Sequence, residues 1–206
     1  MNLPVLILAG GASRRMGRDK AGLMLDGVTL ADRAAARLAG MASPLLLSAG
    51  PHSCQTDGTI TLSDRITGFQ GPLAGIHSGL SWLLEQGHAA SHMLSIAVDT
   101  PFFPENLATA FLAENPASDE IILAASDGRQ HPVFALWPLS LTHMLEQFLL
   151  VPGNRRVMAF IAAHRHRAVA FSEIETPLGV IDPFFNINTE ADLATAARFA
   201  PYFSKM

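Results

Sequence analysis

The chain has 206 residues, of which 49% are hydrophobic and 16% are charged, and its formal net charge is −4. This composition excludes a disordered protein and is typical of one compact domain, residues 1–206, with a large core. The slightly acidic balance excludes a general nucleic-acid binder, and the single cysteine, Cys54, excludes an internal disulfide and a cysteine-based metal site.

A buried strand is expected at residues 3–9, because a short apolar run ends there at a pair of glycines. The loop that follows gathers glycine and positive charge, against the acidic balance of the whole chain. Its notable residues are Gly10, Gly11, Arg14, Arg15, Arg18 and Lys20. A short extended piece at residues 23–25 and a turn at Asp26 and Gly27 come next.

Thr29 is expected to cap a helix that runs to about residue 39. The next predicted elements are a buried strand at residues 44–48, a short strand at residues 59–62 and, after a glycine-rich loop at 67–75, a helix that runs to about residue 85.

The second half of the chain continues this alternation of strands and helices. Strands are predicted at residues 93–98, 121–125, 131–137 and 168–171. A turn at Asp127 and Gly128 allows the strand at 131–137 to run antiparallel to its neighbour. Helices are predicted at residues 104–113, opened by Pro104, at 139–150, at 154–163, and at 189–199, capped by Thr189 with Asp192.

This order predicts an α/β fold, a three-layer sandwich with a mostly parallel mixed sheet. In such sheets, ligands bind beyond the carboxyl ends of the strands. No stretch approaches the roughly 18 apolar residues that a membrane span requires. The first apolar run is also too short for a secretory signal. We therefore expect a cytoplasmic protein with no membrane partner.

The first loop has the composition of an anion-binding site. Glycines let backbone N–H groups approach phosphate oxygens, and arginine and lysine neutralise the charge. We interpret it as a loop that binds the phosphates of a nucleotide, the alternative being an ordinary surface turn. It contains neither the GxxxxGK[ST] pattern of a Walker A loop nor the GxGxxG pattern of a dinucleotide-binding loop.

Four further polar residues are candidates for a binding site. Asp99 follows the predicted strand 93–98 and is suited to Mg²⁺, although Asp-Thr-Pro is also a good turn sequence. Asp64 either binds a sugar hydroxyl or simply ends a strand. Asn186 and Asn188 lie two apart on an extended segment and so face one side, where they either line a polar site or form a turn.

The motifs resemble those of a known family. The segment LAGGASRRMGRDK at 8–20 resembles the signature loop of the molybdenum cofactor guanylyltransferases, the MobA family, which has a Rossmann-like nucleotidyltransferase fold. Further segments are similar to that family in the same order: GPLAGI at 71–76, AVDTPFF at 97–103, DGRQHPVFAL at 127–136, NRRVMAFI at 154–161 and FFNINTEADL at 184–193. The resemblance therefore covers essentially the whole chain.

The resemblance implies roles for individual residues. The nucleotide would be contacted by Leu8, Ala9, Gly10, Gly11, Ser48 and Asp64. Lys20, with Arg14 and Arg15, would hold its phosphates, and Asp99 would bind both the nucleotide and Mg²⁺. Asn186, Asn188, Arg155 and Arg156 would face the pterin or the metal. Ser48 is a departure, because this position is typically asparagine in the family, and serine lacks the paired donor and acceptor of an amide.

The implied reaction transfers GMP from GTP to the terminal phosphate of molybdopterin and releases pyrophosphate. The attacking phosphate is already anionic, so no general base is required. Catalysis would then rest on positioning and on charge neutralisation by Mg²⁺, Lys20 and the arginines. The implied partners are GTP, molybdopterin and, transiently, proteins that deliver or receive the cofactor. The alternatives are a cytidylyltransferase acting on the same pterin, disfavoured by the double glycine, and a non-catalytic GTP- or cofactor-binding protein.

Overall fold

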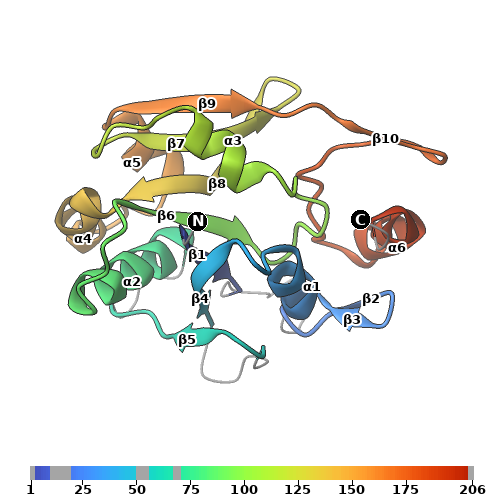
Figure 1. The fold of residues 1–206 in the computed structure, drawn as a ribbon, viewed down its shortest axis with the longest axis horizontal. Helices are drawn as coiled ribbons and strands as arrows, with labels where there is room; N and C mark the ends of the chain where they lie inside the picture. The colour runs from blue at the N-terminus through green and yellow to red at the C-terminus, as the bar shows by residue number, and fades with distance from the viewer. Residues whose placement is uncertain (1–2, 10–19, 50–55, 67–70, 204–206) are drawn as a thin grey trace.

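A seven-stranded mixed sheet forms the centre of the protein (Figure 1), in a computed structural model that describes residues 3–9, 20–49, 56–66 and 71–203. The strand order is β5-β4-β1-β6-β8-β7-β9. The strands are β1 (Leu3–Leu8), β4 (Ala42–Ser48), β5 (Ile60–Leu62), β6 (His92–Ala97), β7 (Ile121–Ser126), β8 (Arg129–Pro138) and β9 (His166–Ala170). In this sheet only β8 runs antiparallel to its neighbours, which confirms the predicted mostly parallel sheet.

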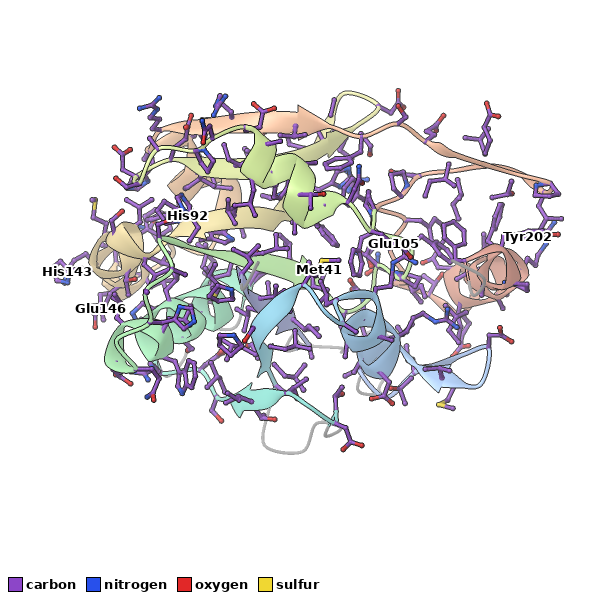
Figure 2. The ribbon with its side chains drawn as sticks, in the orientation of Figure 1. Met41, His92, Glu105, His143, Glu146 and Tyr202 are labelled. Carbon is purple, nitrogen blue, oxygen red and sulfur yellow. The ribbon has the colours of Figure 1, made fainter. Side chains whose placement is uncertain are left out.

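Helices cover both faces of the sheet. One core cluster packs α1 (Leu30–Arg37), α3 (Leu107–Ala113) and α6 (Glu190–Phe199) against one face. The other cluster packs α2 (Pro72–Glu85), α4 (Thr142–Leu150) and α5 (Val157–Ala162) against the opposite face. Side chains fill the space between these layers (Figure 2), and all six residues of β1 are buried, as expected for a strand covered on both faces. The three-layer prediction is therefore confirmed.

Local capping signals are confirmed by the hydrogen bonds at two helix starts. Thr29 is the N-cap of α1, and its hydroxyl accepts a hydrogen bond from the Asp32 backbone N–H at 3.0 Å. Thr189 and Asp192 form a full capping box at the start of α6, with each side chain bound to the backbone of the other residue. Such pairs depend only on residues three apart, so the sequence pattern predicts them well.

Three predicted helix starts are wrong. The helix predicted from Pro104 begins at Leu107, because residues 105–106 form a turn and the Leu107 N–H bonds the Pro104 carbonyl. The helix predicted over 139–150 divides into a 3₁₀ turn, η1 (Leu139–Leu141), and α4. The helix predicted from Asn154 begins at Val157, because Asn154 bonds back to the carbonyls of Val151 and Phe148.

Two small hairpins accompany the main sheet. The first, β2 (Met24–Leu25) with β3 (Val28–Thr29), turns at Asp26 and Gly27 as predicted, and both turn residues have positive φ. The second, β10 (Ile174–Thr176) with β11 (Gly179–Ile181), was not predicted, because its strands are short and carry little alternation of apolar and polar residues. A second 3₁₀ turn, η2 (Ala200–Tyr202), follows α6.

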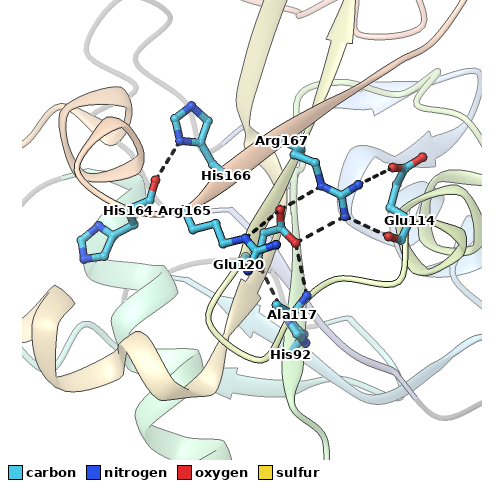
Figure 3. A network of polar contacts seen from close by, with 8 residues as sticks. All are labelled: His92, Glu114, Ala117, Glu120, His164, Arg165, His166 and Arg167. Carbon is cyan, nitrogen blue, oxygen red and sulfur yellow. Dashed lines mark hydrogen bonds and ion pairs between the residues drawn. The ribbon is translucent and has the colours of Figure 1, made fainter.

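An ionic network joins the amino ends of three strands (Figure 3). The carboxylate of Glu120, 3% exposed, lies 2.8 Å from Arg167 Nε and 3.4 Å from Arg165 Nε. The Glu120 carbonyl also bonds His92 at the start of β6. Desolvation raises the pKa of Glu120. Hydrogen bonds from Arg167 and the Ala117 N–H, together with the charges of both arginines, lower it by more, so the net pKa is below its ordinary value.

The two edges of the sheet have different surroundings. His92 lies near the amino edge, on the left in Figure 2, and Tyr202 lies at the opposite end, after α6.

None of the helices in the described parts of the chain combines the length and hydrophobicity needed to cross a bilayer.

Candidate active site

Four parallel strands bring their carboxyl ends to one edge of the sheet, and the arrow of one of them, β6, points to the right in Figure 1. Leu8 and Ala9 lie at the end of β1, Ser48 ends β4, Asp64 follows β5 and Asp99 follows β6. The edge is held together by backbone bonds from the Ala9 N–H to the Ser48 carbonyl at 2.9 Å and from the Val98 N–H to the Leu8 carbonyl at 3.2 Å. The predicted candidates from four separate strands thus share one edge.

A three-residue cluster lies at the centre of this edge. The ammonium of Lys20 donates to Asp99 Oδ2 at 2.7 Å and to Asn188 Oδ1 at 2.9 Å. The side chains of Lys20 and Asp99 are only 19% and 16% exposed. A carboxylate oxygen and an amide oxygen therefore converge on one point, where a positive charge already sits.

Asp99 and Asn188 are held together by the main chain. The backbone N–H of Ile187 donates to the Asp99 carbonyl at 2.8 Å, and the Ile187 side chain is fully buried. Asn186 and Asn188, on either side of it, are exposed, which agrees with the expectation that both face one side. The Asn188 N–H donates to Asp192, and this bond is the first cause of the lowered pKa of the Asp192 carboxyl.

A pocket of about 410 Å³ adjoins this cluster on the side away from β1. Its wall is formed by the first residues of β8, by Thr100 after β6, and by the segment from residue 182 to 188. Asn186 and Asn188 both line it. The cluster therefore separates the ends of β1, β4 and β5 from a pocket large enough for a heterocycle.

Ser48 and Asp64 lie on the β4 and β5 side of the cluster. Ser48 is 4% exposed, and a Cβ added to Gly75 of α2 would lie 2.5 Å from its hydroxyl. The small serine thus matches a close approach of α2 to the end of β4. Desolvation raises the pKa of the Asp64 carboxyl.

Several predicted residues are not joined to the cluster. Gly10, Gly11, Arg14 and Arg15 lie outside the described residues. Arg155 and Arg156 are exposed immediately before α5, and no interaction in the described parts of the chain links them to Lys20 or Asp99.

The cluster of Lys20, Asp99 and Asn188 offers oxygen ligands for a metal ion but no complete coordination shell. Among the described residues, no group of three or more His, Cys, Asp or Glu side chains is placed to hold a metal. Asp99, with Asn188 beside it, offers the two oxygens that already coordinate the Lys20 ammonium. Mg²⁺ is commonly held by one or two carboxylates together with substrate phosphates, so this donor set fits it.

The sequence analysis missed a polar group in the wall of the pocket. The Ser126 hydroxyl lies 2.7 Å from His131 Nε2 and 2.9 Å from Asp182 Oδ1, and the His131 ring stacks on Phe184. A motif search has no signal for such a group, because its members come from β7, β8 and the segment after β11. Of this group the sequence draws attention only to His131, which precedes Pro132 without any metal-ligand spacing and lies in the family-like DGRQHPVFAL segment.

Comparison with known proteins places the chain among nucleotidyltransferases. The family described as "MobA-like NTP transferase domain" matches residues 5–169. A protein of Rhizobium meliloti (strain 1021) named "Molybdenum cofactor guanylyltransferase" is 44% identical, over 97% of this chain and 92% of its own length. A protein of the same name from Rhodopseudomonas palustris (strain HaA2) is 43% identical, over 96% of this chain and 92% of its own length.

Solved structures agree on the fold. The Archaeoglobus fulgidus molybdopterin-guanine dinucleotide biosynthesis protein A has a TM-score of 0.71 at 21% identity and covers 100% of both chains. The Thermus thermophilus 2-C-methyl-D-erythritol 4-phosphate cytidylyltransferase has a TM-score of 0.65 at 19% identity and covers 98% of this chain and 100% of its own. At these identities the likeness concerns the fold alone.

Proposed function

This chain belongs to the MobA-like NTP transferase family, and we propose that it transfers GMP from GTP to the terminal phosphate of Mo-molybdopterin. The products are the guanine dinucleotide cofactor and pyrophosphate. The proposal is supported by relatives of 39–44% identity that are named molybdenum cofactor guanylyltransferases and match over almost the whole chain.

The observation that carries the proposal is the position of Lys20 between Asp99 and Asn188. A half-buried ammonium at the carboxyl edge of a parallel sheet suits the binding of a triphosphate. Leu8, Ala9, Ser48 and Asp64 lie on one side of it, where the nucleotide would bind, and Gly10 and Gly11 follow directly in the chain. The pocket with Asn186 and Asn188 lies on the other side, where the pterin would bind.

We assign Mg²⁺ to the oxygens of Asp99 and Asn188. When bound there with the phosphates, Mg²⁺ neutralises their charge and polarises the reacting phosphorus. Asp99 would then hold the metal, and the Lys20 ammonium, which bonds Asp99 in this structure, would donate to a phosphate oxygen.

Transfer requires positioning and charge neutralisation from the protein. The attacking group is a phosphate monoester that is already anionic, so no side chain has to remove a proton. Lys20, assisted by Arg14 and Arg15, stabilises the negative charge that grows on the leaving pyrophosphate. The two binding regions on either side of Lys20 hold the attacking oxygen near the α-phosphorus.

The direct test is pyrophosphate release from GTP with Mg²⁺ and Mo-molybdopterin, compared with CTP and ATP. The proposal requires release with GTP to exceed release with CTP by at least about tenfold in kcat/KM. Equal or faster release with CTP would instead establish the cytidylyltransferase alternative. Tight GTP binding without pyrophosphate release would establish the non-catalytic one.

We propose that the chain acts as one nucleotidyltransferase domain in the cytoplasm and contacts proteins that supply or receive the cofactor. A pull-down with the purified chain and a molybdoenzyme-maturation protein tests the second point, and the absence of any complex with and without cofactor would contradict it.

A further inference from the structure

We propose that His131 binds the heterocycle of the acceptor substrate by accepting an N–H hydrogen bond at Nδ1, and that Ser126 and Asp182 set the tautomer that makes this possible. This inference deepens the proposed function and rests on it for the identity of the acceptor. It concerns residues in the wall of the pocket that adjoins the Lys20 cluster.

The hydrogen bonds determine which ring nitrogen carries the proton. Ser126 is buried, and its hydroxyl lies 2.9 Å from Asp182 Oδ1; a carboxylate can only accept, so the single hydroxyl proton points to Asp182. The Ser126 oxygen can then only accept from His131 Nε2, which lies 2.7 Å away. A neutral histidine with a proton on Nε2 has a lone pair on Nδ1.

Two further contacts hold this arrangement in place. The backbone N–H of Phe184 donates to the same Asp182 oxygen at 2.8 Å, which anchors the carboxylate. The Phe184 ring stacks on His131, with the two centroids 4.3 Å apart and the planes 23° from parallel. The imidazole is therefore fixed both in its plane and in its tautomer.

The imidazole is also kept neutral by its surroundings. Desolvation is the largest influence and lowers the pKa of His131, and the nearby Arg129 lowers it further, while Asp182 raises it; the net pKa is below the ordinary value of 6.5. At neutral pH the ring is thus uncharged. An uncharged ring in the Nε2–H form presents an acceptor, not a donor, at Nδ1.

The free nitrogen belongs to a residue of the pocket wall. His131 lines the 410 Å³ pocket together with Asn186 and Asn188, and in the described parts of the chain no group bonds its Nδ1. Thr100 lines the same pocket, and its buried hydroxyl likewise has no partner among the described residues. The His131 ring is only partly buried in this wall, so its Nδ1 is available to a polar ligand in the pocket.

The chemistry of the acceptor matches this wall. The acceptor's phosphate has to reach Lys20 and Asp99, so its ring system would lie in the adjoining pocket, which Asn186, Asn188 and His131 line. A pterin presents a 2-amino group and a ring N–H at its outer edge, and these are the donors that a fixed nitrogen acceptor recognises. A flat heterocycle that lacks such donors would leave Nδ1 unpaired and would be discriminated against.

The test compares three variants of the full chain with the wild type in GMP transfer. His131→Phe keeps a planar ring beside Phe184 and removes both nitrogens, and His131→Asn keeps an acceptor oxygen near the position of Nδ1. Ser126→Ala removes the constraint on the tautomer. Each variant is measured for the KM of Mo-molybdopterin, kcat, the Kd of GTP and the melting temperature.

We expect His131→Phe to raise the KM of the acceptor about tenfold, with the GTP Kd changed less than twofold. His131→Asn should recover most of this loss, and Ser126→Ala should raise the same KM about threefold. An unchanged KM in a folded His131→Phe protein would overturn the proposal. Equal losses in His131→Phe and His131→Asn, in step with lowered melting temperatures, would show that His131 is only structural.

A binding measurement separates this inference from the proposed function. Binding of 6-hydroxymethylpterin to the wild type and to His131→Phe is followed by the fluorescence of the pterin. Weaker pterin binding in His131→Phe, without GMP transfer by the wild type, would support the role of His131 in pterin binding and contradict the proposed GMP transfer. GMP transfer with unchanged KM and unchanged pterin binding in His131→Phe would support the reaction and overturn the role of His131.

Discussion

The Lys20 ammonium forms an ion pair with the Asp99 carboxylate at 2.7 Å, although 79 residues separate them in the chain. A metal ion and the Lys20 ammonium would compete for the same carboxylate oxygen. The Lys20 ammonium therefore bonds the carboxylate oxygen that would hold Mg²⁺ in the proposed reaction.

Replacing Lys20 tests its proposed role toward the pyrophosphate. Lys20→Ala should lower kcat at least about 100-fold, because the variant lacks the charge that stabilises the leaving group. Lys20→Arg should recover only part of the activity, since a planar guanidinium does not reproduce the compact ammonium between Asp99 and Asn188. Single-turnover transfer of labelled GMP measures both variants. Asp119→Asn, an exposed change at the amino edge, is the matched control and should retain full activity.

Replacing Asp99 tests the metal assignment. Asp99→Asn keeps the size of the side chain but removes its charge, so we expect a loss of activity of at least about 100-fold and a higher Mg²⁺ concentration at half-maximal rate. Asn188→Ala should have a smaller effect, about tenfold, because it removes a neutral oxygen. Mg²⁺ titrations of the transfer rate provide the measurement. A folded Asp99→Asn protein whose transfer rate depends on Mg²⁺ as in the wild type would contradict the assignment of Mg²⁺ to Asp99.

Gly75 limits the space between α2 and the end of β4. A Cβ at this position would lie 2.5 Å from Ser48 Oγ and 2.7 Å from Leu8 Cδ2, so Gly75→Ala should destabilise the protein by about 1–3 kcal/mol. At Gly79 the nearest atoms belong to the flexible Met93 side chain, and Gly79→Ala should cost less than about 1 kcal/mol. Urea denaturation measures both. Adding Ser48→Ala to Gly75→Ala should recover part of the loss, and strictly additive effects would contradict the clash.

Glu120 anchors the amino edge, away from the proposed site. Glu120→Ala should lower the free energy of unfolding by about 2–3 kcal/mol, because it leaves Arg165 and Arg167 without their shared carboxylate. These arginines are 61% and 43% exposed, so screening by solvent keeps the loss below that of a fully buried pair. GMP transfer measured well below the melting temperature should be unchanged.

The same carboxylate makes stability depend on acidity. The folded-state pKa of Glu120 lies below its ordinary value of 4.5, so the folded state binds this proton less readily than the unfolded state does. Its contribution is present above pH 4.5 and is lost as the pH falls from there through the folded-state pKa. The difference in unfolding free energy between wild type and Glu120→Gln should therefore shrink with acidification below pH 4.5. A constant difference from pH 7 to pH 3 would contradict the assignment.

The sequence by itself determined the local structure and the class of fold. The apolar runs of β1, β4 and β6 end at glycine or at polar residues, and the caps at Thr29 and Thr189 involve residues three apart. The alternation of these elements was enough to predict a mostly parallel sheet, and the rule that ligands bind at the carboxyl edge placed Asp64 and Asp99 there. Such signals depend on interactions within a few residues, so they can be read in order along the chain.

The tertiary structure decided which of these residues meet. The strand order sets β6 between β1 and β8, and this order brings Asp99 to Lys20 and, across 168 residues, Lys20 to Asn188. The same packing joins Ser126, His131 and Asp182 in the wall of the pocket, although only His131 lies in one of the family-like segments. Contacts between distant segments depend on how the layers pack and not on local periodicity. For this reason the tautomer of His131 can be argued only from the folded chain.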